Sequence, residues 1–295
     1  MTEQELFTLV GIRAEQSAPA KKVRRMQGFP WISVILLGII VLCCFFAEVI
    51  MTKDPGYLDL KNYNVAPNSE FLFGTDTLGR DIFSGIWYGG RISVTIGFLA
   101  TLISTFIAVV YGSISGIAPV WLDTLMMRFT EIFLSVPGLL LVLFLQAILG
   151  QANVVTLSIV IGVTSWASIA KIIRTEVRQI RNSEYVVASR CMGGKFFHIL
   201  RKHLGPNFIA SIMFMVVMNV RGAIASESTL SFMGMGLPLE IISWGSMLSL
   251  AEKALLSGCW WMILVPGAFL VTLLMCLTNI GNYLRKNANR KESNL

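Results

Sequence analysis

Charged residues and histidine are scarce in this sequence of 295 residues. Asp, Glu, Lys and Arg together make up 14% of it, and histidine occurs only twice. The five cysteines show no CxxC spacing, so the sequence predicts neither a zinc site nor a disulfide framework. The fourteen methionines are scattered, and we interpret them as apolar filler rather than as soft metal ligands. We therefore expect the chain itself to hold no metal and no cofactor.

The sequence also lacks a phosphate-binding loop. Gly194 and Lys195 resemble the end of such a loop, but Ser189 stands where its first glycine is required, and Phe196 replaces the magnesium-binding Ser or Thr. We therefore predict that the chain does not hydrolyse ATP and is not an enzyme.

The long apolar runs contain no aspartate and no histidine, which argues against an intramembrane protease. Their acidic residues, Glu48 and Glu131, lie near the ends of runs, which argues against a proton-coupled secondary carrier. A channel remains an alternative on these grounds.

What the sequence has in abundance is apolar residues. The hydrophobic share is 55% and the mean hydropathy is +0.69, values typical of a membrane protein. A helix needs roughly 20 apolar residues to cross a bilayer, and helices are favoured there because they pair their own backbone groups. We predict an all-α polytopic membrane protein with six transmembrane helices, at residues 31–50, 92–112, 129–150, 153–170, 208–226 and 259–284.

The distribution of basic residues predicts the orientation of these helices. With the N-terminus in the cytoplasm, 18 of the 24 Lys and Arg residues fall in cytoplasmic segments, as the positive-inside rule expects. Residues 1–28 then form a polar cytoplasmic segment, 29–284 the transmembrane domain and 285–295 a basic cytoplasmic tail. Residues 113–128 form a tight inside turn, and 51–91 and 227–257 face outward. We interpret the net charge of +7 as contact with membrane lipid rather than with nucleic acid.

Two charges near the fifth apolar run are candidates for the translocation path. Arg221 and Glu227 lie within or just after this run, where a charge usually faces a bundle interior or a watery cavity. Asp76, Arg80 and Asp81 include two carboxylates and could act as an acid/base set, but we interpret them as a structural turn.

Residues 183–206 form a basic, amphipathic segment between two apolar runs. Phe196, Phe197 and Leu200 recur at helical spacing, and Gly193 permits a bend before them. The segment resembles the cytoplasmic coupling motif of permease subunits of bacterial ATP-binding-cassette importers, which forms a pair of coupling helices. The resemblance assigns contact with the ATPase subunit to eight residues: Ala188, Ser189, Gly193, Lys195, Phe196, Phe197, Leu200 and Pro206.

Further motifs narrow the resemblance. LFGTDTLGRDIFS at 72–84, YGGRIS at 88–93, SESTLSFMGMG at 226–236 and SWGSML at 243–248 resemble the C-type permease subunits of dipeptide, oligopeptide and nickel importers. The resemblance implies a type I importer fold in the bacterial cytoplasmic membrane.

It also implies the partners: a second, homologous permease subunit in a heterodimer, two ATP-binding subunits that hold ATP and magnesium, and an extracytoplasmic solute-binding protein. The substrate it implies is di- or oligopeptides, with nickel or a metal chelate as the alternative.

Overall fold

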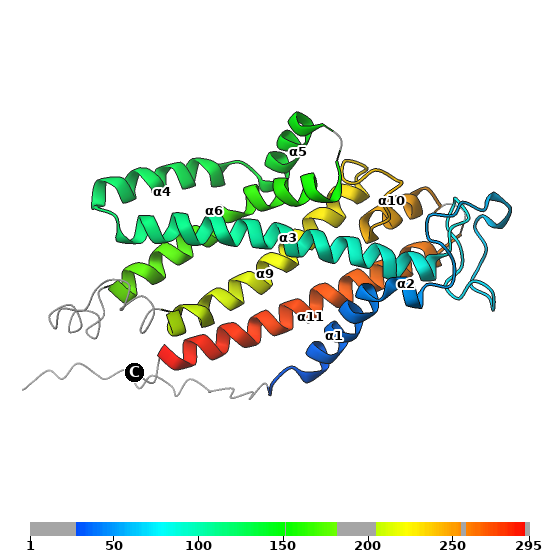
Figure 1. Ribbon diagram of the computed structural model, residues 1–295, viewed down its shortest axis with the longest axis horizontal. Helices are drawn as coiled ribbons and strands as arrows, with labels where there is room; N and C mark the ends of the chain where they lie inside the picture. The colour runs from blue at the N-terminus through cyan, green and yellow to red at the C-terminus, as the bar shows by residue number, and fades with distance from the viewer. Residues whose placement is uncertain (1–27, 151, 182–204, 255–257, 293–295) are drawn as a thin grey trace, which may run out of the picture.

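The computed structural model describes residues 28–150, 152–181, 205–254 and 258–292, and this part of the chain is helical, without a β-strand (Figure 1). Loops and one short 3-10 turn, Leu60–Asn62, connect the helices. The prediction of an all-α fold is confirmed. The helices are α1 (Trp31–Phe45), α2 (Ala47–Ile50), α3 (Ile82–Ile117), α4 (Val120–Ser135), α5 (Gly138–Leu149), α6 (Val154–Arg181), α9 (Gly205–Phe232), α10 (Trp244–Ala254) and α11 (Trp261–Glu292).

Each of the six predicted apolar runs falls on one or two of these helices. By length and hydropathy, α3, α6 and α11 can each cross a membrane, and α4 with α5 would make a fourth, bent span. The apolar α1 is shorter, at 15 residues, and the 28-residue α9 packs between α3 and α11 (Figure 1). Helix α11 continues to Glu292, so residues 285–292 prolong the last helix.

The predictions for residues 113–150 were wrong in two respects. The turn is confined to Ala118 and Pro119, because α3 runs to Ile117 and α4 already begins at Val120. The single span predicted at 129–150 is two helices whose axes differ by 87°. The break follows from Pro137, which holds the preceding Val136 in an extended conformation (φ −89°, ψ 131°) that an α-helix cannot continue.

Helices α3 and α6 cross closely, and small residues make the crossing possible. A Cβ placed on Gly112 of α3 would lie 2.6 Å from the carbonyl oxygen of Ala170, and one placed on Gly162 of α6 would lie 2.9 Å from that of Ala100. Neither position has room for a side chain. Such small residues are how transmembrane helices bring their backbones together, and this pair forms the centre of the bundle (Figure 1).

The loop between α2 and α3 is held by two aspartates. Asp76 accepts hydrogen bonds from the backbone N–H groups of Leu78 and Arg80, both at 2.8 Å, and Asp81 caps α3 by accepting from the N–H of Ser84 at 3.0 Å. Burial raises the pKa of Asp76, and the two backbone hydrogen bonds oppose that shift. The interpretation of these residues as a structural turn is confirmed.

Candidate functional site

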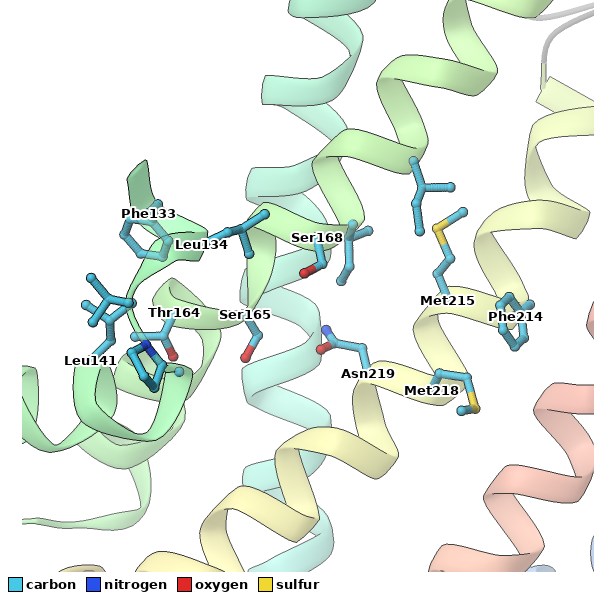
Figure 2. Close-up of a pocket in the computed structure, with 15 residues that line it drawn as sticks. Phe133, Leu134, Leu141, Thr164, Ser165, Ser168, Phe214, Met215, Met218 and Asn219 are labelled. Atoms are coloured by element: carbon cyan, nitrogen blue, oxygen red, sulfur yellow. The ribbon is translucent and has the colours of Figure 1, made fainter. Parts of the chain in front are cut away.

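A cavity of about 530 Å³ lies where α4 and α5 meet, and α6 and α9 form its other walls (Figure 2). The break at Pro137 forms part of its wall, because Val136, Pro137 and Gly138 are among the lining residues. Its lining residues are Phe133, Leu134, Val136, Pro137, Gly138, Leu141, Thr164, Ser165, Ser168, Ile169, Ile172, Phe214, Met215, Met218 and Asn219.

One wall of this cavity is polar but uncharged. Figure 2 shows the side chains of Ser165 and Ser168 on α6 and Asn219 on α9 directed into the space between the two helices. The hydroxyls of Thr164 and Ser165 donate to the carbonyl of Ile161 one turn earlier, at 3.0 and 2.7 Å. Their oxygen lone pairs therefore remain available to a guest in the cavity. Asn219 donates its amide to Ser104 on α3, which fixes its orientation.

The rest of the lining is apolar and adaptable. Met215 and Met218 on α9 are among the lining residues, and unbranched thioether side chains change shape at little cost. Among the described residues that line the cavity, none carries a charge. Such a surface can hydrogen-bond a neutral polar group such as an amide while it accommodates side chains of different shape.

An ion-pair cluster around a buried aspartate lies near the end of α6. Asp123 of α4 has a side chain only 4% exposed, and its carboxylate accepts from Ser115 of α3 at 2.6 Å. Arg174 of α6 donates to both carboxylate oxygens, and Arg178 donates to one at 2.8 Å. We call Ser115, Asp123, Arg174 and Arg178 the Asp123 cluster. It joins α3, α4 and α6 three residues before α6 ends at Arg181.

The predicted coupling residues from Ala188 to Leu200 lie outside the described residues, so their role stays a prediction. Pro206 is the second residue of α9. In this first turn a backbone N–H has no acceptor within the helix, so proline, which lacks the N–H, costs no helical hydrogen bond. The end of α6 and the start of α9 lie at the same end of the bundle (Figure 1).

Arg221 and Glu227, the predicted path residues, do not line the cavity. Glu227 is fully buried and accepts hydrogen bonds from Ser93 of α3 at 2.9 Å and from Ser231 at 3.0 Å. Ser93 also accepts from the backbone N–H of Trp244, so this network ties the start of α10 to α3 and α9. Arg221 is partly buried, and its Nε has no acceptor among the described residues. Their role in the path stays a prediction.

The sequence carries local signals for the cavity but none for the Asp123 cluster. Pro137 interrupts an apolar run, which is a direct sign of a broken helix. Three hydroxyl residues, Thr164, Ser165 and Ser168, share one helix face within another run. Asp123 was placed in a turn, and its basic partners follow 51 and 55 residues later, so no local pattern pairs them.

Comparison with protein families decides the class of this chain. Residues 108–290 match the family described as binding-protein-dependent transport system inner membrane component. The chain belongs to this family. The matched region includes the cavity, the Asp123 cluster and the predicted coupling segment. The expectation of a membrane component rather than an ATP-hydrolysing subunit is therefore confirmed.

Individual relatives of this permease cover most of its length. It is 40% identical to the dipeptide transport system permease protein DppC of Bacillus subtilis. The alignment of 221 residues covers 75% of this chain and 68% of the relative. Identity to the oligopeptide transport system permease protein OppC of the same organism is 36%, over 88% of this chain and 85% of the relative.

A solved structure shares the fold of this permease. A chain of the MetNI methionine ABC transporter, in inward-facing conformations, superposes with a TM-score of 0.56. The sequences are 16% identical, and the match covers 69% of this chain and 96% of that chain. The type I importer fold expected from the sequence is thereby confirmed.

Proposed function

We propose that this permease forms one half of the membrane path of an ATP-driven importer of di- or oligopeptides. The observation that carries the proposal is the 36% identity to an oligopeptide permease along 88% of the chain. The cavity supports it, because neutral hydroxyl and amide groups can hydrogen-bond a peptide backbone, and flexible methionines tolerate varied side chains.

The partners follow from this function. A second, homologous permease subunit completes the path, two ATP-binding subunits supply the energy, and an extracytoplasmic binding protein delivers the peptide. ATP and magnesium are held by the ATP-binding subunits. The chain lies in the bacterial cytoplasmic membrane, with both termini and residues 171–206 in the cytoplasm. The excess of basic residues in these segments supports that orientation.

Coupling in this arrangement runs through α6 and α9. The segment around Gly193, including Ala188, Ser189, Lys195, Phe196, Phe197 and Leu200, docks on an ATP-binding subunit, and Pro206 begins the helix that returns to the bundle. Closure of the ATP-binding subunits moves the ends of α6 and α9. Both helices line the cavity, so the movement changes its access from one side of the membrane to the other. Arg221 and Glu227 on α9 contribute to the translocation path outside this cavity.

Uptake measurements test the proposal. The permease is reconstituted with its partner subunits in proteoliposomes, and ATP-dependent uptake of a labelled dipeptide is compared with uptake of nickel. We expect peptide uptake. Uptake of nickel without uptake of peptide would favour the metal importer instead.

A variant that fills the cavity tests the path itself. Ser165→Leu places a branched side chain among the lining residues and removes a hydroxyl, so we expect uptake to fall at least tenfold. Thr95→Leu is the matched control, because Thr95 also bonds its hydroxyl to its own helix but lies exposed on α3. Equal uptake by both variants, at equal membrane levels, would contradict the assignment of the cavity to the path.

A further inference from the structure

A second cavity, of about 620 Å³, lies between the start of α1 and the end of α11. We call it the basic pocket. It contains two cationic side chains, and no carboxylate occurs among the described residues that line it. The lining residues are Gly28, Pro30, Asn279, Asn282, Tyr283, Arg285 and Lys286.

The side chains of the basic pocket suit a phosphate group. Arg285 and Lys286 supply positive charge. The amide of Asn282 and the second N–H of the Asn279 amide supply neutral donors on the same helix. A cation–π contact also holds Arg285 in position, because its guanidinium carbon lies 5.6 Å from the ring centroid of Phe214 on α9. The pocket therefore presents positive charge and hydrogen-bond donors, and the ring of Phe214 holds one of its two cations in position.

The surroundings of the pocket match the headgroup level of a membrane. The ring of Phe29 contacts that of Trp31 in a tilted arrangement and that of Tyr283 edge-to-face, with centroids 4.6 and 5.2 Å apart. Trp and Tyr are enriched at this level, where a ring is partly in apolar and partly in polar surroundings. Asn279 donates to Ser33 at 3.2 Å and so joins the two helices beneath the pocket.

The helix that follows Pro30, α1, carries an apolar stripe on its exposed face. Ile32, Ile35, Ile39 and Leu42 recur at helical spacing, and their exposed fractions are 83, 57, 52 and 59%. An acyl chain attached to a phosphate in the pocket can extend along this surface. A soluble phosphate carries no acyl chain that could contact this surface. The apolar surface therefore favours a lipid as the source of the phosphate group.

We propose that the basic pocket binds the headgroup of an anionic phospholipid. The lipid bridges the first and last helices of the described structure, at the start of α1 and near the end of α11 (Figure 1). Basic pockets between transmembrane helices recognise lipid headgroups through this chemistry.

The test measures lipid binding to the full chain, purified with its partner subunits in neutral detergent. The probes are phosphatidylglycerol, phosphatidylcholine and inorganic phosphate, followed by native mass spectrometry. The pocket variant is Arg285→Gln with Lys286→Gln. The control variant is Arg128→Gln with Lys171→Gln, which removes the same charge from exposed positions outside the pocket.

We expect phosphatidylglycerol to bind the pocket variant about 30-fold more weakly than the parent, the effect of losing two basic contacts of about 1 kcal/mol each. The control variant should bind as the parent does, and phosphatidylcholine should bind weakly to all three proteins. Equal weakening in both variants would show a general attraction to the basic surface and would overturn the site. Displacement of the lipid by inorganic phosphate would show a soluble anion as the ligand and would overturn the assignment to lipid. The melting temperatures of the variants establish that each is folded.

Discussion

Replacing Asp123 by Asn should weaken the bundle where α3, α4 and α6 meet. The substitution keeps the shape of the side chain but removes the negative charge that Arg174 and Arg178 share. It also removes one acceptor from the Asp123 cluster, since an amide has a single oxygen.

The size of the effect follows from burial. Breaking a fully buried ion pair costs about 3–5 kcal/mol, because the remaining charge stays unpaired in a region of low dielectric constant. The side chains of Arg174 and Arg178 are 23 and 40% exposed, so water partly solvates them after the change. We therefore expect a loss of about 2 kcal/mol, which lowers the melting temperature of a chain of this size by about 4 °C.

The assay compares thermal unfolding of the purified permease variants in one detergent. Glu131→Gln is the control, because Glu131 also contacts two basic residues, Arg128 at 3.1 Å and Lys171 at 3.8 Å, but is 47% exposed. Its ion pairs should contribute no more than about 0.5 kcal/mol. A double-mutant cycle with Arg174→Gln should give a coupling energy of about 1–2 kcal/mol with Asp123→Asn. Equal melting temperatures for the Asp123 and Glu131 variants, or a coupling energy near zero, would refute the reasoning.

Three further predictions concern orientation, coupling and helix packing. Single cysteines at Asn62 and Asn182 in a cysteine-free background should be labelled from opposite sides of the membrane, because the basic residues place these positions on different sides; labelling from one side would defeat the orientation. Gly193→Asp should abolish peptide uptake at a normal membrane level, because a charged, branched side chain blocks the predicted bend; uptake at the parental rate would remove this segment from coupling. Gly112→Ala should destabilise the permease by about 1–3 kcal/mol, because the new Cβ meets the carbonyl oxygen of Ala170 at 2.6 Å, whereas Gly222→Ala, with open space around it, should be neutral or stabilising in the same melting assay.

The apolar runs of the sequence were sufficient to predict the helices that contain them, but not α10 or the full extent of α3 and α4. A bilayer imposes a local requirement, since each crossing segment must be apolar and must satisfy its own backbone hydrogen bonds. This requirement can be read residue by residue, and all six predicted runs fall on helices. The break at Pro137 was also encoded locally, but its angle of 87° was not, because the packing of α4 and α5 against their neighbours sets that angle.

The pairing of polar groups between helices was decided only by the tertiary structure. Glu227 meets Ser93 across 134 residues, and Asp123 meets Arg174 across 51. The sequence shows which helix faces are polar, but a partner is defined only when two faces are brought together by close crossings such as that of Gly112 with α6. The same crossings bring Ser165 of α6 and Asn219 of α9 to one cavity, and so turn scattered polar residues into a site.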